Sequence, residues 1–203
     1  MDCYLRADRI CTDETRTKTW REGGLYRARL GLESASQRIL DDMVKMTTPE
    51  NMEKSLSALS KQGILTSTLW IVGYSGESDS EFESSMSFLE RNHKNIYQAD
   101  PWIFQYHPTG LSGSDEFEKK SNSKRRFSDE INNILSVSPY GLDDGLGTAE
   151  KFDRLERFTK KLKELNIPNP YSMIDTIKAQ KRFAEIHKGS DWNPIKSMKK
   201  SHQ

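Results

Sequence analysis

The stretch GLYRARLGLESASQRILDDMVKMTTPENMEKSLSALSKQGI, residues 24–64, passes from a strand signal through helix signals to the start of another strand. Leu25–Leu32 predicts the second strand of the chain, and Ile64–Val72, rich in apolar and β-branched residues, predicts the third. Between them, Ser36–Lys45 has apolar residues at helical spacing, and Thr48 stands at the cap position of a further helix. Because helices connect the two strands, the sheet is predicted to be parallel.

The segments on either side of this stretch continue the alternation of strands and helices. Their predicted elements are a strand over Cys3–Ile10, a helix over Asp13–Glu22 capped by Thr12 or Asp13, a helix over Asp79–Asn92 and a fourth strand over Ile96–Tyr106. Four strands separated by helices indicate the α/β class.

The pattern changes after the fourth strand. Residues 1–109 form the predicted strand–helix repeat, and 110–147 form a polar loop or insertion, judged from the composition of Pro108–Asp129. Residues 148–188 form a helical C-terminal extension with helices over Thr148–Leu165 and Tyr171–His187, and 189–203 form a flexible tail.

Composition excludes several classes of partner. The 203 residues include 31 basic and 30 acidic side chains, a formal net charge of +1, so no electrostatic argument favours nucleic acid or an anionic membrane. Mean hydropathy is −0.81, and neither a membrane-spanning run nor a signal peptide is found, so we expect a cytoplasmic protein. Cys3 and Cys11 fit no metal-binding spacing and are interpreted as reduced thiols.

Three predicted strand ends carry polar residues. Arg6-Ala7-Asp8 lies in the first strand signal, Gly31-Leu32-Glu33-Ser34 ends the second, and Val72-Gly73-Tyr74-Ser75-Gly76-Glu77 follows the third. Parallel α/β folds bind ligands at the carboxyl ends of their strands. A guanidinium, carboxylates, hydroxyls and glycine amides together suit a zwitterionic, hydroxyl-rich ligand.

These strand ends, in their order and spacing, resemble the radical S-adenosylmethionine (SAM) superfamily, and most closely its cobalamin-associated group. The matching pieces are Arg6-x-Asp8, Gly31-x-Glu33-Ser34-x-Ser36, the helix pair with Met43, Lys45, Thr48 and Glu50, and the Gly73–Glu77 turn within LWIVGYSGESDSEF, residues 69–82. Ser75 stands where the family usually has proline. The resemblance covers Cys3 to about Thr109 and implies the C-terminal half of a partial (βα) barrel of the TIM type.

The resemblance implies roles for particular residues. Arg6 would face the SAM carboxylate or ribose, Glu33 and Ser34 the methionine or substrate side, and the Val72-Gly73 backbone the adenine. The complete enzyme would reductively cleave SAM to a 5′-deoxyadenosyl radical and modify or methylate a small-molecule or peptide substrate.

The cysteine motif of the family, C-x-x-x-C-x-x-C, is missing from this sequence. We therefore expect no metal ligand in this chain, and no activity of the chain alone. The 4Fe-4S cluster would be held by an N-terminal half of the barrel that acts as partner, and cobalamin, if the complete enzyme uses it, would be held by a cobalamin domain outside this sequence. Without that half, an open strand edge and exposed Leu5, Leu30 and Leu69 are expected to cause self-association or marginal stability.

Other interpretations of the same residues are open at this point. Arg6 and Asp8 could form an ion pair, Glu33 could cap the following helix, and Glu77 could be a helix-start residue. The four histidines (His93, His107, His187 and His202) and the alternating Trp102, Phe104 and Tyr106 are interpreted as surface or packing residues. The chain could also be a non-catalytic half-barrel binding module, or an unrelated α/β enzyme using Glu33, Asp8 and Glu77 as acid–base carboxylates.

Overall fold

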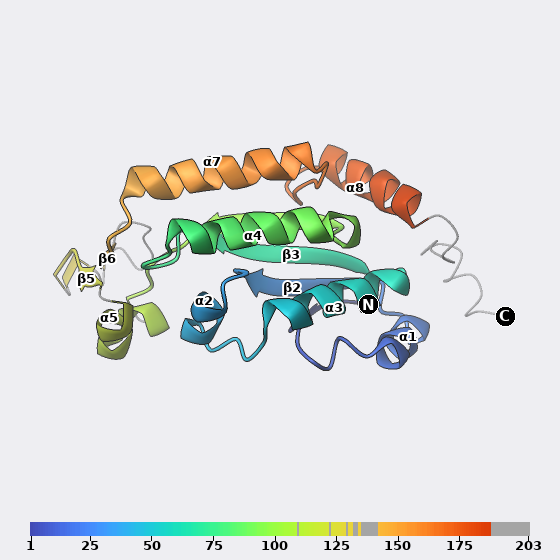
Figure 1. The fold of residues 1–203 in the computed structure, drawn as a ribbon, viewed down its shortest axis with the longest axis horizontal. Coiled ribbons are helices and arrows are strands. Elements are labelled where there is room, and N and C mark those ends of the chain that lie inside the picture. The colour runs from blue at the N-terminus through green and yellow to red at the C-terminus, as the bar shows by residue number, and fades with distance from the viewer. Residues whose placement is uncertain (109, 122, 129, 132–133, 135–141, 188–203) are drawn as a thin grey trace.

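A computed structural model describes residues 1–187 except 109, 122, 129, 132–133 and 135–141. Its main sheet has four parallel strands in the order β1-β2-β3-β4, so each strand pairs with its neighbour in sequence (Figure 1). The strands are β1 (Asp2–Leu5), β2 (Arg27–Glu33), β3 (Leu65–Val72) and β4 (Gln98–Ile103). The predicted parallel α/β sheet is confirmed.

Each connecting helix begins directly after a residue whose side chain caps it. These helices are α1 (Glu14–Glu22), α2 (Gln37–Asp42), α3 (Pro49–Lys61) and α4 (Asp79–Asn92), which continues into the 3-10 helix η1 (His93–Asn95). Asp13, Ser36, Thr48 and Ser78 each accept a hydrogen bond from a first-turn backbone N–H. These caps are local signals, which is why the helix starts were predictable.

One face of the sheet holds the main core. Ala28, Leu30 and Leu32 of β2 pack with apolar side chains of α3, α4 and α7 (Thr148–Glu164), and Trp70 of β3 contacts the ring of Phe158 in α7 at 5.5 Å between centroids. Figure 1 shows α7 lying along α4. Leu30 is fully buried in this layer. The expectation that it would be exposed is wrong, because it points to the helix-covered side.

The other face of the sheet, which we call the open face, is largely polar. The residues on it are partly exposed: Arg27, Arg29, Gly31 and Glu33 of β2 and Ser67, Leu69 and Ile71 of β3. Asp2 of β1 pairs with Arg27 and with Arg29 at 2.9 Å. Leu5 is half-buried against the core. Leu69 is thus the one member of the predicted apolar trio (Leu5, Leu30 and Leu69) that lies on this face.

Several element boundaries differ from the prediction. The first strand ends at Leu5 instead of Ile10, because a turn follows in which Asp8 accepts hydrogen bonds from the backbone N–H groups of Ile10 and Cys11. The fourth strand ends at Ile103 instead of Tyr106. The second helix ends at Asp42 instead of Lys45, and the positive φ of Val44, 54°, turns the chain away from the helix.

The described residues of the segment 110–147, predicted as a polar loop or insertion, include helices and short strands. The segment holds the 3-10 helix η2 (Leu111–Gly113), α5 (Asp115–Ser121) and an antiparallel pair of short strands, β5 (Lys124–Arg125) and β6 (Leu142–Asp143). The predicted C-terminal helices are confirmed as α7 and α8 (Met173–Ile186). The predicted tail, 189–203, lies outside the described residues. Of the helices that the structure describes, none is long and apolar enough to cross a membrane.

Candidate functional site

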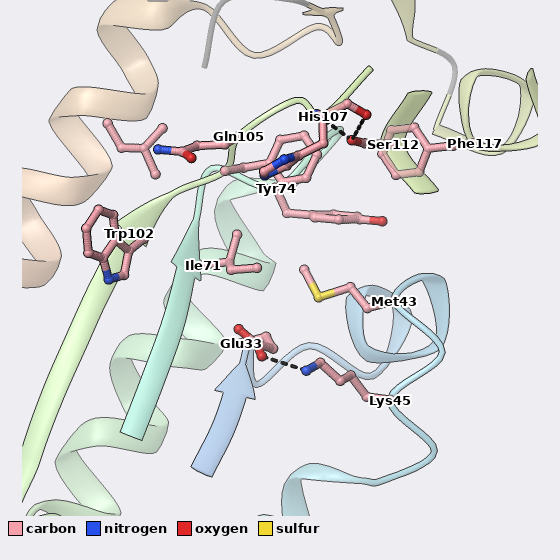
Figure 2. A pocket seen from close by; sticks show the side chains of 12 residues that line it. Glu33, Met43, Lys45, Ile71, Tyr74, Trp102, Gln105, His107, Ser112 and Phe117 are labelled. Atoms are coloured by element: carbon pink, nitrogen blue, oxygen red, sulfur yellow. Dashed lines mark hydrogen bonds and ion pairs between the residues drawn. The ribbon is translucent and has the colours of Figure 1, made fainter. Parts of the chain in front are cut away.

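A cavity of about 420 Å³ opens where β2, β3 and β4 end. Its walls come from these strand ends, the segment after α2, the turn after β3 and the region around η2 and α5 (Figure 2). The lining residues are Glu33, Met43, Lys45, Ile71, Tyr74, Trp102, Ile103, Phe104, Gln105, His107, Ser112 and Phe117. We call this cavity the strand-end pocket. It lies at the edge of the sheet where the sequence predicts ligand binding.

A charged pair crosses one side of the strand-end pocket. Glu33 Oε1 accepts a hydrogen bond from Lys45 Nζ at 2.6 Å, and both side chains are largely buried (Figure 2). Glu33 has a left-handed φ of 63° where the pairing of β2 with β3 shifts register. Gly31 makes room for the pair, since a Cβ there would lie 2.5 Å from Glu33 Oε1.

Glu33 does not cap the next helix. Ser36 does so, because its hydroxyl accepts from the backbone N–H of Ile39. The capping interpretation of Glu33 is therefore wrong, and its carboxylate is directed to Lys45.

Aromatic rings form the opposite part of the strand-end pocket. Tyr74 meets Phe104 edge to face at 5.1 Å, and Phe104 stacks on Phe117 at 6.1 Å. Burial raises the pKa of the Tyr74 phenol to about 12, so it is neutral near pH 7. Trp102 is half exposed, and Figure 2 shows it across Ile71 from Lys45. The prediction that Trp102 packs is thus only partly correct, whereas Phe104 and Tyr106 are buried as predicted.

This arrangement suits a particular kind of ligand. Apolar cavities with few fixed polar groups are typical of small-molecule sites. The Glu33 carboxylate and the Lys45 ammonium, which now pair with each other, could instead pair with the ammonium and the carboxylate of a zwitterionic ligand. The aromatic rings could contact a planar or apolar part of the same ligand.

Of the five residues predicted to contact SAM, the structure brings Glu33 into the pocket lining. Arg6 is exposed after β1. Ser34 is buried, and its hydroxyl accepts from the N–H of Ser36. Val72 lies in the core and Gly73 in the turn that follows. The SAM contacts of these residues stay predictions.

The Gly73 turn is covered by residues from much later in the chain. A Cβ at Gly73, whose φ is 72°, would lie 2.8 Å from Cγ of Lys151 in α7. Lys151 Nζ pairs with Asp144 at 2.7 Å, and both side chains are buried. The backbone N–H of Gly73 donates to Glu77. The start of α7 therefore closes the side of this turn that the sequence suggested was open.

Glu77 is a buried anchor, and its interpretation as a helix-start residue is wrong. Ser78 caps α4, while Glu77 Oε2 pairs with Arg154 Nη1 at 3.0 Å, with both side chains 2% exposed. Sequence reasoning missed Lys151 and Arg154. A signal was present, because both are in phase with Phe158 and Leu162 on the buried stripe of α7.

The remaining sequence hypotheses are not supported by the geometry. Among the ion pairs of the described residues, Arg6 and Asp8 form none with each other, and Asp8 instead accepts from Ile10. Glu33, Asp8 and Glu77 do not assemble into one site, since each has a separate partner. In the part of the chain that the structure describes, no group of three or more His, Cys, Asp or Glu could hold a metal ion.

Comparison with known proteins gives partial relatives. No protein-family model matches the chain. The anaerobic magnesium-protoporphyrin IX monomethyl ester cyclase of Rubrivivax gelatinosus is 28% identical over 153 residues, which cover 74% of this chain and 26% of the cyclase. An uncharacterized methyltransferase of Pyrococcus horikoshii is 30% identical over 89 residues, 43% of this chain and 19% of that protein.

A solved structure has the same fold. Coproporphyrinogen III oxidase from Escherichia coli, described as a radical SAM enzyme, superposes with a TM-score of 0.55 at 13% identity, covering 80% of this chain and 31% of the oxidase. The chain thus spans at most about a third of these relatives. The parallel strand–helix sheet of this chain is therefore similar in fold to part of that oxidase, and its sequence is similar to part of the cyclase and of the methyltransferase.

Proposed function

We propose that this chain is the C-terminal part of a radical SAM enzyme, which binds SAM or substrate in the strand-end pocket and modifies a small-molecule or peptide substrate. The observation that carries the proposal is the Glu33–Lys45 pair, held in an aromatic cavity at the carboxyl ends of a parallel sheet. In the complete enzyme a 4Fe-4S cluster and SAM, with cobalamin if it is used, supply the radical chemistry.

The pocket chemistry is compatible with SAM, whose amino-acid end carries a carboxylate and an ammonium. Lys45 could pair with the carboxylate and Glu33 with the ammonium or a ribose hydroxyl, because each charged group already faces the cavity. The aromatic wall offers a face for a ring. Ser34, Val72 and Gly73 would need greater exposure to add their contacts, most of all Gly73, which α7 covers. Arg6 is exposed but lies outside the pocket lining.

The residues of this chain do not fit an iron–sulfur cluster. Cys11 is buried, its thiol donates to the Arg6 carbonyl, and burial raises its pKa to about 11. Iron requires a thiolate, which this environment opposes. The other cysteine is Cys3, in β1, so only one further thiol could serve as a ligand.

We infer that the cluster is held by another part of the complete enzyme, which we expect to pair with the free edge of β1. Within the described residues β1 pairs with β2 alone, and Tyr4 of β1 is 71% exposed. A strand with one unpaired edge is a template for another strand. The expected partner is therefore an N-terminal half-barrel with the C-x-x-x-C-x-x-C motif.

The experiment combines this chain with such a half-barrel, reconstitutes the cluster anaerobically and measures 5′-deoxyadenosine released from SAM. Glu33→Gln and Lys45→Met should each reduce release at least about tenfold, the effect of losing one charge-assisted contact of roughly 1.4 kcal/mol or more. Glu50→Gln and Lys54→Met are matched controls, because that pair has the same 2.6 Å distance but is exposed on α3. Equal effects at both pairs would overturn the role of the pocket.

The alternative is a non-catalytic half-barrel module. It is favoured by the polar open face and by the closure of the Gly73 turn by α7, since both would stabilise the chain without a partner. A monomer that unfolds cooperatively and forms no complex with the N-terminal half would support this alternative and refute the enzyme proposal.

A further inference from the structure

We propose that the open face carries a second ligand site, separate from the strand-end pocket, that binds the carboxylate group of a small molecule. The site is a cavity of about 50 Å³ nearer the middle of the strands. It is lined by Tyr4, Arg29, Ser67, Thr68, Leu69, Gln98, Asp100 and Pro170. The lining therefore takes residues from all four strands and from the segment between α7 and α8.

Two buried polar atoms in this cavity have no partner. Gln98 is 1% exposed, and its side-chain Nε2 makes no hydrogen bond within the described part of the chain. The same holds for Ser67 Oγ, and the two residues face each other in the register of β3 and β4. On the opposite face of β3, Thr68 is satisfied, because its hydroxyl donates to the Gln98 carbonyl and accepts from Trp70.

Burying a donor without an acceptor is unfavourable, so unpaired groups in native proteins call for an explanation. Two such groups lie side by side in the lining of one cavity, and one bound acceptor would satisfy both. A carboxylate oxygen can accept from the Gln98 amide and from the Ser67 hydroxyl together.

The charges beside the cavity favour an anion. Arg27 and Arg29 share the single carboxylate of Asp2, which leaves one positive charge in excess in this group. Arg29 binds Asp2 through Nε and Nη2. Arg29 also lies over the Tyr4 ring, 5.7 Å from its centroid, which holds the guanidinium beside the cavity.

Asp100 is the one acidic side chain in the lining and opposes an anion. Its carboxylate accepts a hydrogen bond from the Tyr171 hydroxyl, which partly offsets that charge. This predicts an unusual result, because removing Asp100 should strengthen binding.

The size of the cavity selects the ligand group. A water molecule occupies about 30 Å³ in the liquid, so about 50 Å³ accommodates one or two waters or a group of three or four non-hydrogen atoms. A carboxylate fits this limit, with the rest of its molecule extending over the open face.

Acetate is the probe, and the readout is the ¹⁵N–¹H signal of the Gln98 side-chain amide in the full chain. Sodium acetate is titrated against sodium chloride at constant ionic strength. We expect a saturable shift with acetate and none with chloride. Arg29→Gln should weaken binding at least about tenfold, the equivalent of about 1.4 kcal/mol, and Asp100→Asn should tighten it.

Two controls separate this site from the strand-end pocket. Lys45→Met removes the cation of that pocket and should leave the Gln98 shift unchanged. A second measurement follows thermal unfolding, where acetate should raise the unfolding temperature of the chain. Gln98→Leu should abolish this increase, whereas Gln105→Leu, which changes the strand-end pocket, should leave it unchanged.

The proposal is overturned if the Gln98 signal does not respond to acetate, if chloride shifts it equally, or if Lys45→Met abolishes the response. Ordered water alone in the cavity of crystals grown with acetate would also overturn it. The assay uses neither SAM nor a cluster, so its result is independent of the proposed enzyme function.

Discussion

Replacing Arg154 by methionine should cost this protein a large part of its stability, because it leaves Glu77 buried without its cation. Arg154 Nη1 donates to both the carbonyl oxygen and Oε2 of Glu77, at 2.8 and 3.0 Å. Its other partners, Asp79 and Glu150, are exposed and contribute little. Breaking a buried ion pair costs about 3–5 kcal/mol, so we expect an unfolding free energy lower by about that amount.

The pH dependence of this variant identifies the mechanism. Burial raises the pKa of Glu77 above its ordinary value, and Arg154 is the main group that opposes the rise. A carboxyl whose folded pKa is raised favours folding most at low pH, when it is protonated, and this contribution is lost as pH rises through the folded pKa. The loss in Arg154→Met should therefore be smaller at pH 5 than at pH 8.

Urea unfolding followed by circular dichroism measures both effects. Arg157→Met is the matched control on α7, because Arg157 pairs with Glu83 on the surface and should lose no more than about 1 kcal/mol. Adding Glu77→Gln to Arg154→Met should recover most of the loss, since the amide keeps an acceptor for Gly73 without a charge. If Arg154→Met loses no more than Arg157→Met, the buried pair is not the anchor that we describe.

Three further predictions concern a carboxyl, a thiol and a glycine. A hydrogen bond from Arg38 is the largest cause that lowers the pKa of Glu81 to about 2, so its stabilisation is present above pH 4.5 and is lost as pH falls towards 2. Glu81→Gln should reduce the loss of unfolding free energy between pH 4.5 and pH 2 by about 1–2 kcal/mol, after allowance for solvent screening. An acid titration by near-UV circular dichroism that is the same in both proteins would contradict this. Cys11 should react with iodoacetamide at pH 8 far more slowly than Cys3, because burial raises the Cys11 pKa to about 11; equal labelling by mass spectrometry would argue against it. Gly73→Ala should destabilise the protein more than Gly24→Ala, as measured by urea unfolding. Both glycines have positive φ, which costs alanine about 1–2 kcal/mol, but only at Gly73 would the new Cβ lie 2.8 Å from a side-chain atom. Equal losses would mean that Lys151 in α7 moves aside at no cost.

The helix starts and the parallel sheet could be predicted because their signals are local. The caps at Asp13, Thr48 and Ser78 satisfy backbone N–H groups within the next three residues, so neighbouring sequence is sufficient. The order of the family motifs likewise predicted the barrel segment, and placed Glu33 at a strand end that does line a pocket.

One feature of the sheet was present in the sequence but misjudged. Arg27 and Arg29 alternate with Ala28 and Leu30, the period-two pattern of a strand with one polar face. The expectation that Leu30 is exposed is wrong even so, because Leu30 is fully buried. Local pattern gives the alternation, but which set faces the helices depends on the covering layer.

Only the tertiary structure decided which strand ends are open. The turn at Gly73 is closed by Lys151, and Glu77 is buried by Arg154, although both cations lie on a helix far along the chain. Glu33 meets Lys45 because its backbone takes a left-handed φ at a register shift, which no residue spacing specifies. Capping and alternation are determined by near neighbours, whereas exposure and ion pairing depend on distant segments that the fold brings together.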